Sequence, residues 1–433
     1  MFFSTIRWPA LVALVVAGVL SVSPAYASYH VIYSFCSLAN CADGYGPNVG
    51  VVMDKKGNLY GTTDGGGADG RGTIFELVKK EHKWEEKVLY SFCSQANCTD
   101  GATPNGELIL DTSGNLYGIS VERGGHDNGN IFELLPNARK TKWTLRVLHD
   151  FCEVTSPQCA DGTFALAGLS YSGESTGALY DGESPLYGTA TNGGTQGGGL
   201  VYQLNRVRRK WKETAVYNFC SEPGCADGDA PQARVVVDAS SNIWGTAATG
   251  GPSGGGVVFR LTPNSGAWTE KVLYSFCSLA NCADGSFPSS QPLLDSEGNV
   301  FGTAMYKGAD SERCLDGSDC GVIFKIAVDG TESTLHQFCT VEACPDGAGP
   351  QGSLTMDNAG NLFGTTVGVD GPGTLFKFDG SLEVLNTFCS QQNCLDGYEP
   401  FSVKLVSNRF GTMFGTARAG GPGGGGVVFE WKP

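Results

Sequence analysis

The chain has 433 residues, of which 41% are hydrophobic and 10% aromatic, and this composition is too apolar for an intrinsically disordered protein. Its 63 glycines and 19 prolines, combined with the aromatic residues, are typical of short strands joined by tight turns. A formal net charge of −15 disfavours nucleic acids and anionic membrane surfaces as partners.

Residues 1–27 have the features of a secretory signal peptide. Arg7 precedes an apolar run over residues 10–22, which is too short to span a bilayer comfortably, and Ala25-Tyr26-Ala27 fits a cleavage site. An uncleaved N-terminal anchor is the alternative, but Ser23-Pro24 interrupts the run. We therefore expect a secreted or periplasmic mature chain, residues 28–433, without membrane insertion after signal cleavage.

The sixteen cysteines form closely spaced pairs with none left over. In an exported chain this pattern predicts a disulfide within each pair. A zinc site would need thiolates in sets of four or nearby histidines, and the five histidines do not recur with the pairs. The predicted bridges are Cys36–Cys41, Cys93–Cys98, Cys152–Cys159, Cys220–Cys225, Cys277–Cys282, Cys314–Cys320, Cys339–Cys344 and Cys389–Cys394.

One unit recurs seven times along the chain, starting at the cysteines numbered 36, 93, 152, 220, 277, 339 and 389. The recurring parts of the unit are a cysteine loop ending in Asp-Gly, an apolar run closed by Asp-x-x-Gly-Asn as in VVMDKKGN (51–58), an aromatic strand such as LYGTT (59–63), and a glycine-rich loop. Two further strands complete it, as in GTIFELV (72–78) and WEEKVLYSF (84–92). The alternation of apolar and polar residues has the strand period. The sequence therefore predicts an all-β fold, a seven-bladed β-propeller of four-stranded antiparallel blades.

The two ends of the repeat array are in complementary phase. Residues 30–35 match the last strand of a unit, whereas residues 427–433 match the third strand. We expect the N-terminal strand to complete the last blade, so that residues 28–433 form a single closed domain without a long free edge. An open superhelix, the alternative, would usually need capping units, and none is visible in the sequence.

The run DGxxP…LxxDxxGNLYGTTxxGGxxGxGTxFxL is nearly intact over residues 42–77, and weaker copies cover the rest of the mature chain. It resembles the GloVer-type, or choice-of-anchor, tandem repeat of bacterial exported proteins. The resemblance implies an exported repeat protein with a propeller fold. It implies no settled activity, so no catalytic residues are transferred. The paired cysteines add to the commoner pattern, and without a C-terminal sorting tail we do not expect surface anchoring.

The aspartates of the seven Asp-Gly pairs are expected on the face that carries the cysteine loops and the glycine-rich loops. Calcium binding by a ring of carboxylates is one interpretation. Turn capping is the favoured alternative, because a residue present in every blade more often serves the blade than one site. These aspartates are Asp43, Asp100, Asp161, Asp227, Asp284, Asp346 and Asp396.

A unique site requires a break in the repeat, and two insertions provide one. The fifth unit carries residues 305–321 on the expected binding face, and the third carries residues 170–185 on the opposite face. For both, the alternative is a tolerated surface insertion. The candidate binding residues in the fifth unit are Asp310, Glu312, Arg313, Asp316 and Asp319.

The sequence contains no zinc-binding His-Glu-x-x-His motif, and its enzyme signatures are weak. We therefore predict a monomeric, non-catalytic binding or interaction module for carbohydrate or cell-envelope material. Calcium is the one cofactor under consideration. The alternative is an extracellular hydrolase or lyase acting on glycans or lactones, with a metal in the axial funnel. Several carboxylates, histidines or asparagines from different blades converging at the channel would favour the enzyme.

Overall fold

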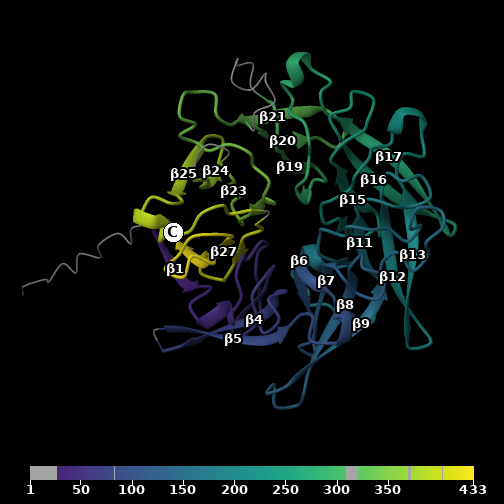
Figure 1. Ribbon diagram of the computed structural model, residues 1–433. Coiled ribbons are helices and arrows are strands. Elements are labelled where there is room, and N and C mark those ends of the chain that lie inside the picture. The colour runs from purple at the N-terminus through teal and green to yellow at the C-terminus, as the bar shows by residue number, and fades with distance from the viewer. Residues whose placement is uncertain (1–26, 82, 309–319, 369–371, 402) are drawn as a thin grey trace, which may run out of the picture.

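The computed structural model describes residues 27–433 apart from 82, 309–319, 369–371 and 402. The predicted signal peptide, except for its last residue, lies outside this range. Seven four-stranded sheets, called blades 1 to 7, are arranged in a ring (Figure 1). No helix among the described residues is long and apolar enough to cross a membrane. The predicted propeller is confirmed.

The strands of blades 1 to 3 follow one another from the ring centre outward. Blade 1 contains β2 (Val52–Met53), β3 (Leu59–Thr63), β4 (Thr73–Lys80) and β5 (Lys83–Ser91). Blade 2 contains β6 (Ala102–Leu110), β7 (Leu116–Glu122), β8 (Asn130–Pro136) and β9 (Trp143–Asp150). Blade 3 contains β10 (Ser170–Tyr171), β11 (Leu186–Ala190), β12 (Leu200–Val207) and β13 (Lys210–Asn218).

Blades 4 to 7 repeat this order. Blade 4 contains β14 (Val236–Val237), β15 (Ile243–Ala247), β16 (Val257–Asn264) and β17 (Ala267–Ser275). Blade 5 contains β18 (Leu293–Leu294), β19 (Val300–Ala304), β20 (Val322–Ile326) and β21 (Glu332–Gln337). Blade 6 contains β22 (Thr355–Met356), β23 (Leu362–Thr366), β24 (Thr374–Phe378) and β25 (Leu382–Thr387). Blade 7 contains β26 (Val406–Ser407), β27 (Met413–Ala417), β28 (Val427–Lys432) and β1 (Ser28–Ser34).

Short 3₁₀ turns are the only helical elements in the described part of the chain. Five of them end at the second cysteine of a cysteine loop: η1 (Ala39–Cys41), η2 (Ala96–Cys98), η4 (Pro223–Cys225), η5 (Ala280–Cys282) and η6 (Gln392–Cys394). The sixth, η3 (Glu174–Thr176), lies in the insertion of blade 3.

The ring is closed by the N-terminal strand, as the sequence predicted. β1 pairs antiparallel with β28, from Ser28 opposite Lys432 to Ser34 opposite Val427. Tyr29 of β1 also packs its ring against Phe388 of blade 6 and Phe429 of β28, with centroid distances of 5.7 and 5.2 Å. The outer strand of blade 7 therefore comes from the opposite end of the chain.

A glycine and an aromatic ring on neighbouring strands explain the recurring Leu-Tyr-Gly-Thr motif. A Cβ atom on Gly61 of β3 would lie 2.6 Å from the ring of Phe75 on β4, so no larger residue fits there. The equivalent pairs are Gly118–Phe132, Gly188–Tyr202, Gly245–Phe259, Gly302–Phe324, Gly364–Phe376 and Gly415–Phe429. The glycine is thus required by a close approach rather than by a turn.

The same aromatic rings join each blade to the next. Phe35, which follows β1 of blade 7, lies against Phe75 of blade 1 with a centroid distance of 4.9 Å. The equivalent contacts between blades are Phe92–Phe132, Phe151–Tyr202, Phe219–Phe259, Phe276–Phe324, Phe338–Phe376 and Phe388–Phe429. Such edge-to-face pairs, most of them fully buried, supply packing energy beyond their buried area.

Three glutamates on the outer strands lie in the gaps between blades, and each has a buried Oε1 without a hydrogen-bond partner among the described residues: Glu86, Glu213 and Glu270. Burial, followed by the charge of Asp43, raises the pKa of Glu86 to about 8. Burial is also the main cause that raises the pKa of Glu213 and of Glu270 to about 7. These carboxyl groups favour the protonated form in the folded protein.

We expect the free energy of unfolding to fall as the pH rises. A carboxyl whose folded pKa is raised stabilises the fold fully below its unfolded value of 4.5 and loses that contribution as the pH passes about 7 to 8. Glu86→Gln should therefore raise the melting temperature at pH 8.5 and change it little at pH 5.5. Glu85→Gln, at an exposed position on the same strand, is the control. Equal effects of Glu86→Gln at both pH values would contradict the prediction.

Candidate functional site

The cysteine loops contain the predicted disulfides. Seven of the eight pairs are bonded within their own loops: Cys36–Cys41, Cys93–Cys98, Cys152–Cys159, Cys220–Cys225, Cys277–Cys282, Cys339–Cys344 and Cys389–Cys394. The eighth pair includes Cys314, which lies outside the described residues. Seven disulfides fit an oxidising environment, extracellular or periplasmic.

The aspartates of the Asp-Gly pairs hold the cysteine loops together, and all of them are buried except Asp346, which is partly exposed. Asp43 Oδ2 accepts hydrogen bonds from the backbone N–H of Ser37 at 2.9 Å and from the hydroxyls of Ser37 and Tyr33 at 2.8 and 3.0 Å. Its Oδ1 accepts from the N–H of Leu38 at 3.2 Å. Burial acts to raise the pKa of Asp43, but these hydrogen bonds outweigh it and hold the pKa below its usual value.

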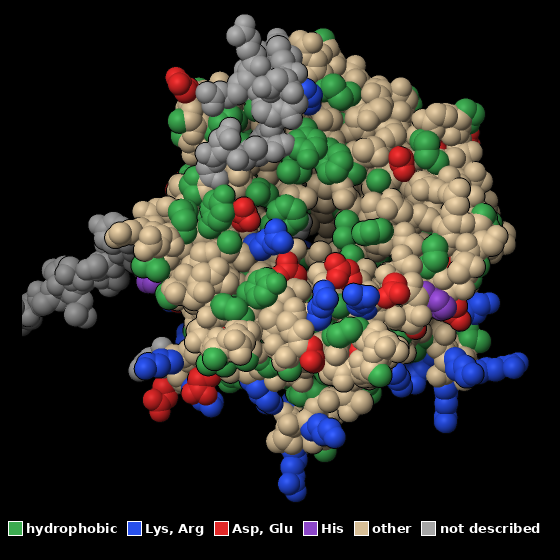
Figure 2. Space-filling model, in the orientation of Figure 1, with side chains coloured by type: hydrophobic (Ala, Val, Ile, Leu, Met, Phe, Trp, Pro, Cys, Tyr) green, Lys and Arg blue, Asp and Glu red, His purple; other side chains and the backbone are tan. Residues whose placement is uncertain are grey.

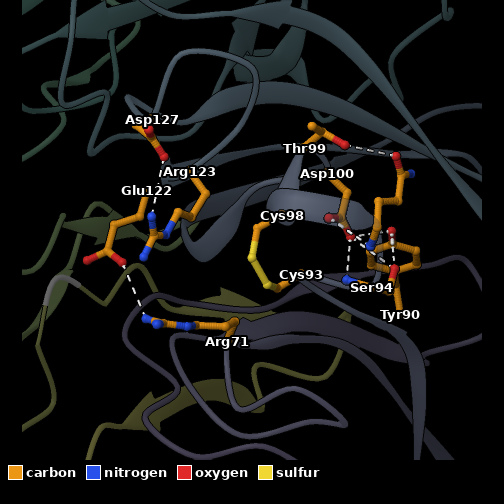
Figure 3. The surroundings of a disulfide bond; sticks show 11 residues. Arg71, Tyr90, Cys93, Ser94, Cys98, Thr99, Asp100, Glu122, Arg123 and Asp127 are labelled. Atoms are coloured by element: carbon orange, nitrogen blue, oxygen red, sulfur yellow. Dashed lines mark hydrogen bonds and ion pairs between the residues drawn. A yellow bond between two sulfur atoms is a disulfide. The ribbon is translucent and has the colours of Figure 1, made fainter.

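The arrangement recurs around the ring. Figure 3 shows the carboxylate of Asp100 bonded to Ser94 and Tyr90 beside the disulfide of Cys93 and Cys98. The other five carboxylates also accept backbone N–H groups of their own loops: Asp161, Asp227, Asp284, Asp346 and Asp396. This geometry supports the turn-capping interpretation, since the oxygens a cation would need already bond to the loop.

Side chains that could ligate a metal ion rarely lie close together in the described part of the chain. Its one group of three with metal-binding spacing is Cys220, Cys225 and Asp229, and the two sulfur atoms of this group are bonded to each other.

We expect Asp43→Ala to lower the free energy of unfolding by about 1–3 kcal/mol, because it leaves the N–H groups of Ser37 and Leu38 without their acceptor. Asp69→Ala, at an exposed position in the glycine-rich loop of the same blade, is the control and should have little effect. Chemical denaturation measures both. A rise in melting temperature with calcium that Asp43→Ala abolishes would instead support the cation ring.

The cysteine loops and glycine-rich loops form one face of the ring, here called the cysteine face. In blade 1, Tyr45 of the cysteine loop forms a bridge with Gly65 of the glycine-rich loop. The neighbouring blade is joined in as well, because Gly46 donates its N–H to the carbonyl of Gly425. The shared face is thus confirmed.

A cavity of about 210 Å³ lies on the axis of the ring, lined by residues of all seven blades. Figure 2 shows the hollow at the centre of the molecule. The lining residues lie between the cysteine loops and the first hairpins of the blades, within β6 in blade 2 and just before the first strand in the other blades. In blade 1 that hairpin turns at Asp54, whose Oδ1 accepts the N–H groups of Lys56 and Asn58. Positions counted back from this turn residue define two rings of side chains around the axis.

The charged ring lies four residues before the turn in each blade, by the register of the first hairpin. Its members are Gly50, Glu107, Gly168, Arg234, Gln291, Ser353 and Lys404. The repeat is broken here, because equivalent positions carry a carboxylate, a guanidinium, an amide, an ammonium group or no side chain.

Arg234 is the centre of an ion triad in the charged ring. Only 7% of its side chain is exposed, and its Nη1 and Nη2 lie 2.6 Å from Glu107 and 2.7 Å from Glu174. Its Nε also donates to the carbonyl of Leu169 at 3.0 Å. Burial acts to lower the pKa of Arg234, but the two carboxylates outweigh it and raise that pKa above its usual value.

Gln291 extends this network across the axis. Its Nε2 donates to the carbonyl of Val235 at 3.1 Å, so its Oε1 faces Lys404 and accepts from Nζ at 2.9 Å. The backbone N–H of Gln291 donates to Ser353 Oγ at 3.1 Å. Together with the triad, these bonds form a belt of polar groups at one end of the cavity.

The amide ring lies six residues before the turn, nearer the cysteine face. Its described members are Asn48, Asn105, Leu166, Gln232, Ser289 and Gln351, and its seventh position lies outside the described residues. Three of its oxygen atoms are buried without a hydrogen-bond partner among the described residues: Asn48 Oδ1, Ser289 Oγ and Gln351 Oε1. Four polar members of the ring line the cavity, Asn105, Gln232, Ser289 and Gln351, so its wall carries amide and hydroxyl groups.

The structure describes one of the two predicted insertions, whereas most of the other lies outside the described residues. The candidate binding residues Asp310, Glu312, Arg313, Asp316 and Asp319 lie outside the described residues, so they stay a prediction. The insertion at 170–185 is firmly anchored: Tyr180 is fully buried, its ring lies 5.2 Å from that of Tyr117 in blade 2, and Glu174 reaches Arg234.

The charged ring was missed at the level of the sequence. A sequence signal for this ring existed, because the residue four positions before the first hairpin turn changes its chemistry from unit to unit. Two Gly-x-Ser-x-Gly segments, 173–177 and 251–255, also match the pattern of a hydrolase nucleophile. Both serines are exposed, Ser175 in the single 3₁₀ turn η3 and Ser253 in the glycine-rich loop of blade 4, and neither is followed by the longer helix that the motif requires.

The repeat described as the Gloeobacter/Verrucomicrobia repeat matches residues 17–181, 160–366 and 283–433. The chain belongs to this family. The three matches of the Gloeobacter/Verrucomicrobia repeat overlap and together include all seven blades. No curated protein matches the sequence.

Several solved structures are similar, at low identity, to this member of the Gloeobacter/Verrucomicrobia repeat family. A putative 6-phosphogluconolactonase from Bacteroides fragilis is 15% identical, with 83% of this chain and 87% of that chain covered and a TM-score of 0.48. A gluconolactonase from Xanthomonas campestris is 12% identical, with 78% and 85% covered and a TM-score of 0.40. A putative glucose dehydrogenase from Thermus thermophilus is 11% identical, with 94% and 100% covered and a TM-score of 0.38. These similarities carry no argument about activity.

Proposed function

We propose that this protein is an exported, non-catalytic binding module whose axial cavity takes a carbohydrate. The observation that carries the proposal is the set of amide and hydroxyl side chains that line the cavity, those of Asn105, Gln232, Ser289 and Gln351. Sugar hydroxyls both donate and accept, which matches a wall of amide and hydroxyl groups.

Asn105 and Glu107 of blade 2 and Glu174 of blade 3 converge near the axis, as an enzyme would require, but both carboxylates are bonded to a cationic side chain. A hydrolase or lyase needs a carboxylate, histidine or nucleophile free to act on its substrate. Glu107 and Glu174, the carboxylates that approach the axis in the described part of the chain, are both bonded to Arg234. One oxygen of each carboxylate is therefore held by the guanidinium.

The proposal is tested on the purified chain with an array of neutral oligosaccharides, followed by calorimetry on any glycan that binds. Gln351→Leu removes one amide of the ring while keeping its size. We expect binding to weaken about tenfold, as for loss of one or two hydrogen bonds. The melting temperature should not fall, because the lost Oε1 had no partner.

Gln392→Leu is the matched control, since the same change is made at an exposed residue of the blade 7 cysteine loop. Unchanged binding by Gln351→Leu would place the ligand elsewhere and contradict the proposal. Conversion of a bound oligosaccharide into shorter or unsaturated products would establish the hydrolase or lyase instead.

A further inference from the structure

Two aromatic side chains stand at equivalent, conformationally unusual positions above the cavity. Phe164 and Phe287 are each the third residue after an Asp-Gly aspartate, and their φ angles are +53° and +63°. The left-handed region is rare for bulky residues and costs about 1–3 kcal/mol unless the surroundings hold it. Here they do: Phe287 donates its N–H to Gly255 and accepts from Met305, and Phe164 accepts from Thr191.

Core packing does not account for these two rings. Phe164 is 52% exposed, and Phe287 lies against Tyr306 with a centroid distance of 5.0 Å and an angle of 46°. Each precedes by two residues a member of the amide ring, Leu166 or Ser289. They therefore lie beyond the amide ring toward the cysteine face, next to lining residues but not in the lining of the cavity itself.

The side chains around the cavity are charged on one side and hydrophobic on the other. On the side of blades 7, 1 and 2, ion pairs join Arg418 to Asp64 at 3.3 Å and Arg71 to Glu122 at 3.9 Å. Figure 2 shows charged side chains gathered on this side of the hollow and hydrophobic ones on the side of blade 5. An apolar platform beside a polar cavity suits a sugar, whose ring has an apolar face and polar edges.

The charged ring fills the far end of the cavity, where Arg234 and Gln291 are only 7% and 6% exposed. The triad of Arg234 and the bonds between Gln291, Ser353 and Lys404 connect blades 2 to 7 there. A volume of about 210 Å³ is also below the ~300–1,000 Å³ typical of pockets for drug-sized ligands. The cavity has room for one small ring and admits it only from the cysteine face.

We infer that the cavity recognises the terminal residue of a glycan chain end-on, and that the next sugar stacks on Phe164 or on the pair of Phe287 and Tyr306. This inference rests on the proposed function, because it specifies which part of a carbohydrate the cavity takes. A chain that ran across the face could not place an internal residue in a cavity filled at its far end.

The direct test is an array of linear oligosaccharides of two to six residues, each immobilised once through its reducing end and once through its other end, together with cyclic oligosaccharides. We expect binding in one orientation of a given glycan and none to the cyclic compounds. Equal binding in both orientations, or binding to the cyclic compounds, would overturn end-on recognition and leave the proposed function standing. Absence of binding to every glycan would overturn both.

Substitutions separate the platform from the cavity. The double variant Phe164→Ala with Phe287→Ala should weaken binding of an oligosaccharide about tenfold, the order expected for a lost stacking contact, and should leave the affinity for its terminal monosaccharide unchanged. Phe410→Ala is the control, since Phe410 is 71% exposed in a hairpin on the opposite face. Equal losses for the oligosaccharide and the monosaccharide, or no loss, would contradict the stacking role.

Discussion

Arg234→Ala should lower the free energy of unfolding by about 3–5 kcal/mol, the largest effect that we expect from one substitution in this protein. The guanidinium bonds to Glu107 and Glu174 and is almost completely buried. Its removal leaves a buried carboxylate on the ring axis without a counter-charge, and this is far more costly than loss of an exposed ion pair. Thermal and chemical denaturation measure the loss.

The pH dependence identifies the cause. An unpaired, buried Glu107 would have a raised pKa, so its protonation should restore part of the stability as the pH falls. The destabilisation should therefore be larger at pH 8 than at pH 5. Arg418→Ala removes an arginine from a half-exposed ion pair with Asp64 and should cost less than about 1 kcal/mol. Equal losses for the two variants would contradict the assignment of the triad.

Deletion of residues 28–34 should destabilise the whole ring rather than loosen one end. Blade 7 would lose its outer strand, the edge of β28 would be exposed, and the contacts of Tyr29 with Phe388 and Phe429 would disappear. Several large side chains at roughly 1.5–3 kcal/mol each correspond to a fall in melting temperature of about 10 °C or more.

A circular permutant is the control for this deletion. Ser28 pairs with Lys432, so a short turn after Pro433 can lead directly into residues 28–34 placed at the C-terminus. The permutant keeps every strand of blade 7 and should recover the melting temperature of the natural chain. An unchanged melting temperature in the deleted chain, or no recovery in the permutant, would contradict closure by β1.

The fold was predictable because its determinants are local and repeated. The glycine of each Leu-Tyr-Gly-Thr motif and the aromatic ring that covers it recur at the same spacing, as Gly61 and Phe75 do in blade 1. The phase of the two chain ends likewise predicted the pairing of β1 with β28. Repetition strengthens these signals, since each blade gives an independent copy of the same pattern.

The cavity was not predictable in the same way. Glu107 and Arg234 are separated by 127 residues, and their contact depends on the first strands of blades 2 and 4 meeting at one height on the axis. The insertion at 170–185 was recognised in the sequence as a break in the repeat. That Glu174 reaches the axis from this insertion was not predicted. The ring of unpartnered oxygens depends on which side of a short strand faces inward, which the apolar pattern of such strands does not specify.

The seven described disulfides each join two cysteines of one loop, and none of them connects one blade to another. The covalent pattern is therefore contained within the repeated unit. Duplication or loss of such a unit during evolution leaves no thiol without its partner and requires no existing bridge to be exchanged. The number of blades in related chains can thus change by recombination while oxidative folding continues to follow the same local rule.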